Sequence, residues 1–153
     1  TCAELQQGIE EETEVLLNTQ GVSCTWSNAC PTHLLRCHKD ALIGAVLNLI
    51  NNAVQAGGSR VRIGLTMNLT ATGDLNLAVV DNGPGIRPEL LSTVKDVFVT
   101  TKAQGTGLGL SVVDTVAERH GGRFVLQSRQ GKGTCAQLLL PLAPLTKYTA
   151  HVS

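Results

Sequence analysis

Three short stretches of this sequence carry residues suited to binding a phosphorylated ligand. The most distinctive is Gly105-Thr106-Gly107-Leu108-Gly109-Leu110, which runs directly into a segment, residues 111–120, whose apolar period predicts a helix. Glycines let the backbone approach a ligand closely, and the free N–H groups of a helix's first turn favour negative charge. The junction is therefore a candidate phosphate site, although a glycine cluster alone does not identify the ligand.

The second stretch is a predicted helix, residues 39–56, with an unusual polar face. At 100° per residue, Asn48, Asn51, Asn52 and Gln55 share one arc of about 100°, and the opposite side is apolar. A solvated face is the simpler interpretation, but such faces favour Glu, Lys and Arg because asparagine is a poorer helix former. Carboxamide oxygens are neutral, hard ligands that suit Mg²⁺.

The third stretch, Asp81-Asn82-Gly83-Pro84-Gly85-Ile86, follows a predicted strand over residues 75–80. All of its polar and glycine residues favour turns, so it could be only a turn. A carboxylate at the end of a buried strand nevertheless needs hydrogen-bond donors, which the exocyclic amine of a base would supply. The two glycines would let a flat base lie against the backbone. Lys102 could reach a phosphate, but an exposed lysine is usually only solvated.

The elements that must position these stretches alternate between helix and strand patterns. A first helix is expected over residues 3–17, and Asp40 is a reasonable N-cap for the long helix that Gly57 and Gly58 would close. The alternation predicts strands over residues 22–26, 34–37, 60–69, 75–80, 123–128 and 134–140, with the last four forming two antiparallel hairpins. This pattern predicts an α+β sandwich with helices on one face of the sheet.

Composition excludes several classes of protein. The 153 residues fit one domain, and 12 basic residues balance 12 acidic ones, so no overall field favours nucleic acid or an anionic membrane. The sequence has no spanning segment and no signal region, which predicts a cytoplasmic domain without membrane contact. Five cysteines without a C-x-x-C pair predict reduced thiols rather than a disulfide framework or a zinc site. His120 is predicted to end a helix, where a cation is favoured near the last carbonyls, rather than to act in catalysis.

The three stretches and residues 96–102, taken in order along the chain, resemble four motifs of a known family. NLINNAVQA (48–56), DNGPGI (81–86), DVFVTTK (96–102) and GTGLGLSVV (105–113) resemble the N, G1, F and G2 boxes of the sensor histidine kinase ATP-binding domain. GKGT (131–134) followed by LLLPL resembles that family's last strand, and the likeness covers roughly residues 3–142. The TTK before GTGLGL is similar to the branch that serves nitrogen-regulation-type and flagellar-type response regulators.

Two other nucleotide sites are excluded by the sequence. The glycine spacing in residues 105–109 is not that of a Rossmann site. GKGT lacks the first glycine of a P-loop, and a predicted strand rather than a helix follows Gly133.

The resemblance implies a fold and a set of site residues. The fold would be a two-layer α/β sandwich (Bergerat fold, GHKL superfamily), whose mixed, largely antiparallel sheet is covered on one face by about three helices, with a mobile ATP lid over about 87–104. Asp81 would bind the adenine amine, Thr134 would support it, and Asn52 would coordinate Mg²⁺. No residue is assigned a certain catalytic role. The ATP site as implied comprises Asn48, Asn52, Gln55, Asp81, Gly83, Gly85, Ile86, Thr101, Lys102, Gly105, Thr106, Gly107, Leu108, Gly109, Leu110 and Thr134.

The function implied is a histidine protein kinase of a bacterial two-component system, which uses ATP and Mg²⁺. Related ATPases such as gyrase and Hsp90 place a glutamate where this chain has Asn48, and a carboxamide cannot act as the general base for hydrolysis. Residues 1–153 are expected to form one catalytic domain, with 146–153 a candidate tail and the phosphoacceptor histidine domain absent. Its partners would be that domain's dimerisation hairpin and a response regulator, with no nucleic acid. The alternatives are a nucleotide-sensing module without kinase activity, an ATPase of the same superfamily and a serine kinase of the anti-sigma type. Gln55 stands where many relatives carry Lys or Arg against the phosphates.

Overall fold

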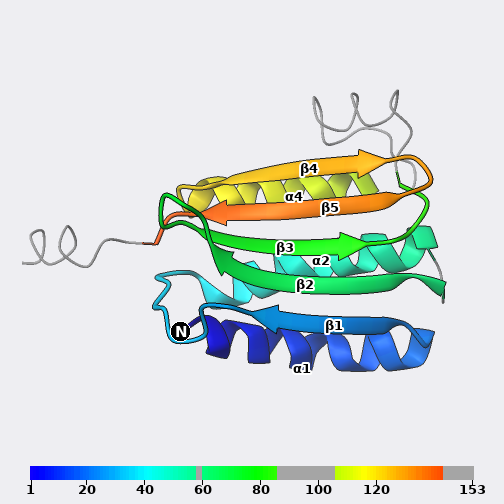
Figure 1. The fold of residues 1–153 in the computed structure, drawn as a ribbon, viewed down its shortest axis with the longest axis horizontal. Coiled ribbons are helices and arrows are strands. Elements are labelled where there is room, and N and C mark those ends of the chain that lie inside the picture. The colour runs from blue at the N-terminus through cyan, green and yellow to red at the C-terminus, as the bar shows by residue number, and fades with distance from the viewer. Residues whose placement is uncertain (58–59, 86–105, 143–153) are drawn as a thin grey trace, which may run out of the picture.

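A computed structural model describes residues 1–57, 60–85 and 106–142 of the chain as one sheet backed by helices (Figure 1). The elements in chain order are α1 (Cys2–Gln20), β1 (Ser23–Asn28), α2 (Lys39–Gly57), β2 (Arg62–Leu69), β3 (Leu75–Asp81), α4 (Thr106–Arg119), β4 (Arg123–Arg129) and β5 (Gly133–Leu140). The lid predicted at 87–104 and the candidate tail at 146–153 lie outside the described residues.

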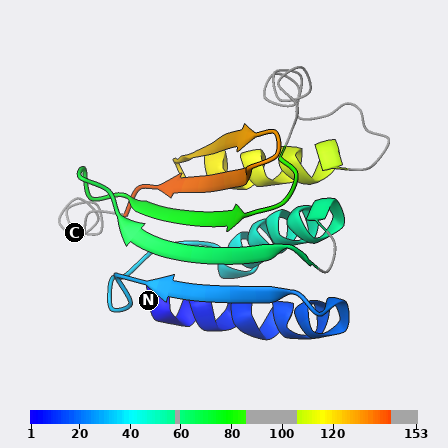
Figure 2. The ribbon, with the colours of Figure 1, turned by 45° about the vertical axis from the view of Figure 1, so that its right-hand side comes forward.

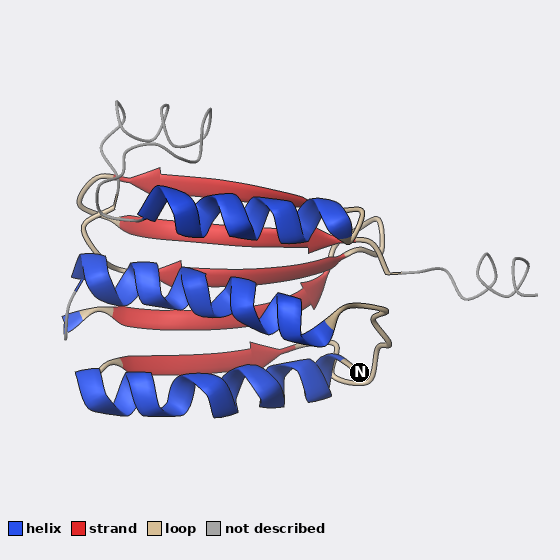
Figure 3. Ribbon diagram, turned by 180° about the vertical axis from the view of Figure 1, so that it is seen from behind, coloured by secondary structure: helices blue, strands red, loops and turns tan. Residues whose placement is uncertain are grey.

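The strands form a five-stranded sheet in the order β1-β2-β3-β5-β4. β1 runs parallel to β2, and the other neighbouring strands are antiparallel. Figures 2 and 3 show α1, α2 and α4 side by side on one face of this sheet, while the other face carries no helix among the described residues. The structure confirms the predicted two-layer sandwich, its mixed sheet and both antiparallel hairpins.

The core lies between the helices and the face of the sheet that they cover. Alternate residues of β2 and β3 point into it, so Ile63, Leu65 and Leu77 are almost fully buried. The apolar side of α2 packs on them, with Leu42 and Ile50 fully buried. Each such side chain contributes roughly 1.5–3 kcal/mol on burial. The apolar faces predicted for α2 and for the hairpin strands are therefore the ones that build the core.

Two local predictions were wrong. Residues 34–37 form no strand. The loop before them directs its carbonyl groups to the start of α1. The Pro31 carbonyl accepts a hydrogen bond from the Ala3 N–H at 3.0 Å, and the His33 carbonyl accepts one from the Cys2 N–H at 2.9 Å. These bonds satisfy helix N–H groups that would otherwise lack partners. α2 begins at Lys39, so Asp40 lies in its first turn and is not the N-cap.

Two predictions about bulk properties can be compared with the described residues. All five cysteines lie in the described part of the chain and are free thiols. No helix in the described ranges combines the length and apolar character that crossing a membrane requires.

Candidate functional site

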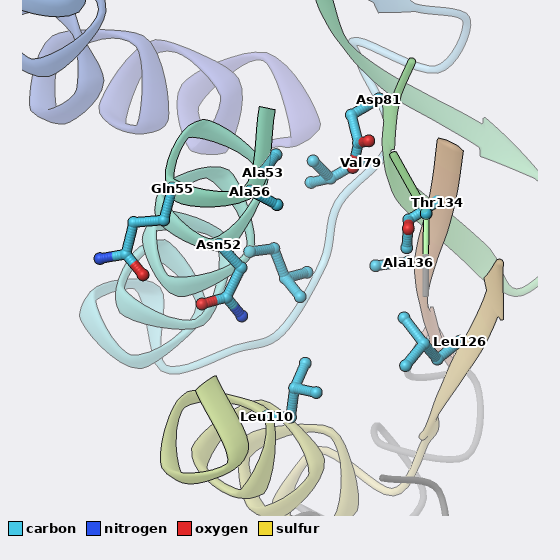
Figure 4. Close-up of a pocket in the computed structure, with 12 residues that line it drawn as sticks. Asn52, Ala53, Gln55, Ala56, Val79, Asp81, Leu110, Leu126, Thr134 and Ala136 are labelled. Atoms are coloured by element: carbon cyan, nitrogen blue, oxygen red, sulfur yellow. The ribbon is translucent and has the colours of Figure 1, made fainter. Parts of the chain in front are cut away.

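A cavity of about 290 Å³ opens between α2, α4 and the sheet, close to the lower limit of typical ligand pockets. Its walls come from elements far apart in the sequence (Figure 4). The lining residues are Leu49, Asn52, Ala53, Gln55, Ala56, Val79, Asp81, Gly85, Leu110, Leu126, Thr134 and Ala136. The walls are mostly apolar with a few polar groups, which is the character expected of a site for a flat heterocycle.

Asp81 lies at the end of β3, where its side chain enters the cavity from the sheet. Its Oδ1 accepts the Gly83 N–H at 2.8 Å. Burial raises the pKa of the Asp81 carboxyl, and hydrogen bonds from the backbone N–H groups of Gly83 and Thr134 partly counter that shift by favouring the charged form. Asp81 is therefore a half-buried carboxylate held in one orientation with acceptor capacity left toward the cavity.

Thr134 lies directly across from Asp81, because β3 and β5 pair these two residues in register. Its hydroxyl oxygen is 2.8 Å from the Ser128 hydroxyl on β4. The carboxylate and the hydroxyl thus lie at the same end of the cavity (Figure 4). This juxtaposition was predicted from the resemblance, and the sheet register is what produces it.

The polar face of α2 contributes unequally to the cavity. Asn52 and Gln55 line it, whereas the half-buried Asn48 and the exposed Asn51 are not among its lining residues. Figure 4 shows the Asn52 carboxamide directed toward the side of α4. The Asn52 Nδ2 atom is buried and has no hydrogen-bond partner in the described structure. A buried N–H group without an acceptor destabilises the fold unless a ligand supplies the acceptor. Among the polar groups on this wall, the Asn52 carboxamide is therefore the one that most requires a hydrogen-bond partner.

Of the two predicted glycines after β3, Gly85 fits tightly against the β4–β5 hairpin. Gly85 has φ 73°, and a Cβ added there would lie 2.0 Å from the Arg129 carbonyl oxygen. Gly83 packs against its own loop, since a Cβ would lie 3.0 Å from Asp81 Oδ1. Gly133, which was not among the predicted site residues, has φ 121° and would place a Cβ 2.1 Å from the Asp81 carbonyl oxygen. Gly85 and Gly133 therefore let the segment after β3 and the β4–β5 hairpin approach each other closely.

Residues 106–110 of the glycine-rich stretch are part of α4 rather than of a loop before it. The helix was expected from about residue 111 but begins at Thr106, so that Gly107, Leu108 and Gly109 lie in its first turn. Leu110 and Val113 are almost fully buried, and Leu110 lines the cavity, which places this first turn beside it. The remaining predicted residues, Ile86, Thr101, Lys102 and Gly105, lie outside the described part of the chain.

His120 was expected to lie at a helix end near the last carbonyls rather than to act in catalysis. It follows the last residue of α4, where its Nδ1 lies 2.8 Å from the Val116 carbonyl oxygen and its Nε2 accepts the His38 backbone N–H at 3.0 Å. His120 joins the end of α4 to the start of α2, away from the cavity lining.

Sequence reasoning missed two kinds of site residue. The apolar walls, Leu49, Ala53, Ala56, Val79, Leu126 and Ala136, were readable as core positions, but not as positions beside an opening. Ser128 and Gly133 support the polar end of the cavity from the closing hairpin. Their signal was weak, because a serine at a strand end and a glycine after a turn are common in any hairpin.

Comparisons with known proteins agree on one family. The family described as histidine kinase-, DNA gyrase B- and HSP90-like ATPase matches residues 37–144. Sensor protein kinase FleS of Pseudomonas aeruginosa is 46% identical over 135 residues, covering 88% of this chain and 33% of FleS. Sensor histidine kinase ZraS of Escherichia coli is 39% identical over 108 residues, covering 71% of this chain and 23% of ZraS. The nucleotide-free catalytic domain of histidine kinase ThkA has a TM-score of 0.77 at 26% identity and covers 91% of each chain.

The fold, the cavity and the matched residues together define the class: the chain belongs to the histidine kinase-, DNA gyrase B- and HSP90-like ATPase family. Within that family it is the ATP-binding catalytic domain of a sensor histidine kinase. The chain spans only a quarter to a third of the length of FleS and ZraS.

Proposed function

We propose that this chain binds Mg·ATP and transfers the γ-phosphoryl group to a histidine on a separate dimerisation hairpin of the same kinase. A response regulator would then receive the phosphoryl group from that histidine. Residues 1–153 would act as one catalytic domain in this reaction. The proposal rests on the family of the chain and on the distribution of polar groups around the cavity.

The base would occupy the end of the cavity where Asp81 and Thr134 meet. The Asp81 carboxylate would accept a hydrogen bond from the adenine amine. Apolar side chains of the walls, among them Val79 and Ala136, would cover the faces of the ring. The triphosphate would extend toward the first turn of α4, whose N–H groups favour negative charge. Gln55, Gly83, Gly85 and residues 106–109 border this path, and Ile86, Thr101, Lys102 and Gly105 are proposed to complete it.

The donor set at Asn52 fits a magnesium ion that arrives with the nucleotide. Among the described residues, no group of three carboxylate, histidine or cysteine side chains could hold a metal alone. Mg²⁺ commonly takes one or two protein oxygens and completes its shell with water and substrate phosphates. Asn52 would supply one oxygen, and its buried, unpartnered Nδ2 would gain an acceptor from the same assembly. The ion would neutralise charge on the phosphates when bound.

Transfer is favoured over hydrolysis because of where the one carboxylate of the cavity lies. Among the described lining residues, Asp81 alone is acidic, and two backbone N–H groups hold it at the base end. Asn48, one turn before Asn52 on α2, is a carboxamide and cannot take a proton from water. Phosphoryl transfer needs mainly positioning and charge neutralisation, which this cavity supplies without a base. This placement of Asp81 is the observation that carries the proposal.

The test supplies the acceptor as a separate protein. The chain is incubated with γ-labelled ATP, Mg²⁺ and the dimerisation hairpin domain of the same kinase, and acid-labile, base-stable label on that domain is measured. We expect label on the hairpin's histidine and little release of free phosphate without it. ATP binding with no transferred label would favour the nucleotide-sensing alternative. Rapid phosphate release without an acceptor would instead favour the ATPase alternative.

A further inference from the structure

Two cysteines from separate parts of the sequence meet at the start of α1. Cys2 lies in the first turn of that helix and Cys30 lies in the loop after β1, with exposed fractions of 0% and 2%. Two backbone hydrogen bonds join this loop to the helix, from the Cys2 N–H to the His33 carbonyl at 2.9 Å and from the Ala3 N–H to the Pro31 carbonyl at 3.0 Å. Figures 1 and 3 show the loop beside the N-terminus. The backbone thus holds both cysteines at one end of the edge that α1 and β1 form.

The two thiols are also in direct contact, because the side chains of Cys2 and Cys30 are hydrogen-bonded to each other. The backbone of Cys30 is fixed on both sides. Its N–H donates to Asn28 Oδ1 at 3.0 Å, and its carbonyl accepts the His33 N–H at 3.2 Å. An S–S bond is about 2.05 Å long, so two sulfur atoms already in hydrogen-bond contact need only a small approach to form one.

Burial keeps these thiols unreactive while the edge is closed. It is the main cause that raises the pKa of the Cys2 thiol to about 11, and the adjacent Cys30 acts in the same direction. The thiolate is the nucleophile in disulfide exchange, and on the order of one Cys2 thiol in ten thousand is then ionised at neutral pH. β1 is an edge strand that pairs only with β2, and local opening there would expose both thiols to water and restore an ordinary pKa. Reaction is therefore expected from the locally open state.

We propose that Cys2 and Cys30 form an oxidation site, which a low-molecular-weight disulfide of the glutathione class converts into an intramolecular disulfide. One cysteine thiolate attacks a sulfur of the oxidant and forms an S–S bond to it, while the oxidant's own S–S bond breaks and releases a thiolate. The thiolate of the other cysteine then attacks the protein sulfur of this mixed disulfide and releases the second thiolate. Two electrons pass to the oxidant, and the two cysteine protons end on the two released thiols. This proposal goes beyond the proposed function and does not depend on it, because neither cysteine lines the cavity.

The disulfide would fasten the start of α1 to the loop after β1. It would close a covalent loop of roughly 30 residues that runs through both elements, and a cross-link of this kind stabilises a protein mainly by restricting its unfolded chain. Openings that separate α1 from this loop would be suppressed, whereas openings around α4 and β4 would not. Oxidation would therefore stabilise one edge of the domain selectively.

The first experiment maps the linkage in the wild type. The reduced chain is incubated with oxidised glutathione in mildly alkaline buffer, free thiols are trapped with N-ethylmaleimide, and the peptides are identified by mass spectrometry. We expect one new linkage, between Cys2 and Cys30, with Cys24, Cys37 and Cys135 alkylated. Urea below the global unfolding transition should speed the reaction at least about tenfold, because it populates the open edge. A linkage through Cys37, mixed disulfides alone, or no reaction even in urea would overturn the proposal.

Serine variants test whether the linkage stabilises the edge. The oxidised wild type should melt about 5–15 °C above the reduced protein. Hydrogen exchange through local opening should slow at least about tenfold in α1 and β1 and change less than about twofold in α4 and β4. Cys2→Ser and Cys30→Ser should each abolish these shifts, and Cys37→Ser, the matched control, should keep them. Equal melting of oxidised and reduced wild type, or loss of the shifts in Cys37→Ser, would contradict the proposal. If a serine variant does not fold, the peptide map of the wild type decides.

Discussion

Gly85 offers a sharp test of how the site is held together. In Gly85→Ala the new Cβ would lie 2.0 Å from the Arg129 carbonyl oxygen, so the hairpin backbone must retreat by about 1 Å to reach even 3.0 Å. That movement would also strain the bond from Gly131 N–H to the Pro84 carbonyl, which is 2.6 Å long. The positive φ of 73° costs alanine about 1–2 kcal/mol, the overlap about 1–3 and the hydrogen bond about 1. The expected loss in the free energy of unfolding is about 3–6 kcal/mol.

Gly131 provides a matched control in the same hairpin. Its φ is 80°, but a Cβ added there would meet no atom within 4 Å, so Gly131→Ala should cost only the backbone term of about 1–2 kcal/mol. Urea unfolding followed by circular dichroism measures both losses, and a nucleotide titration measures affinity. Gly85→Ala should also weaken ATP binding, because the displaced hairpin carries Thr134 away from Asp81. Equal losses of stability in the two variants would refute the steric argument.

Three further predictions concern single side chains. Burial raises the pKa of Asp81. The wild type should therefore gain stability relative to Asp81→Asn as pH falls through that raised pKa toward about 4. Its affinity for ATP should fall over the same pH range, because the carboxylate becomes protonated. Parallel unfolding free energies of the two proteins across that range would contradict this. Asn52→Ala should weaken the binding of Mg·ATP, measured by calorimetry, about tenfold, and ATP affinity in that variant should be the same with Mg²⁺ as with EDTA. Replacing the exposed Asn51 by alanine should change neither quantity, and equal effects of the two substitutions on affinity would refute the assignment. His120→Ala should cost about 0.5–1.5 kcal/mol in urea unfolding, because it removes the hydrogen bond from the exposed His38 N–H, and an unchanged midpoint would oppose that reasoning.

The parts of the fold that were predictable depend on local pattern. The period of two in β2 and β3 and the apolar face of α2 predicted which side chains are buried. The resemblance pointed to Asp81, Asn52 and Thr134, which all line the cavity. The role of Gly133 was not predictable, because it depends on β5 lying next to β3 rather than on the hairpin alone. A β4–β5 hairpin could join the sheet through either strand, and local sequence does not choose between them. Residues 34–37 failed for a related reason, since their loop is determined by contacts with α1.

The start of α4 shows the same limit in a helix. Its glycines lower helix propensity locally, which placed the expected start near residue 111. The observed start at Thr106 agrees with Leu110 and Val113 both being buried, because packing stabilises a turn that propensity alone would not. Similarly, the apolar alternation of β4 and β5 showed that Leu126 and Ala136 face inward, but not that α2 and α4 leave a cavity above them.

The distribution of the cavity lining among the elements has a consequence for local unfolding. Among the described residues, α2, β3, α4, β4 and β5 all contribute to the lining, whereas α1, β1 and β2 contribute none. A bound ligand opposes only those openings that separate the elements it contacts. A bound nucleotide would therefore slow hydrogen exchange that occurs through partial opening of α2, β3, α4, β4 and β5. Local unfolding of the edge formed by α1 and β1 would occur at the same rate with or without the nucleotide. The domain thus combines a ligand-stabilised half with an edge whose opening is independent of the nucleotide.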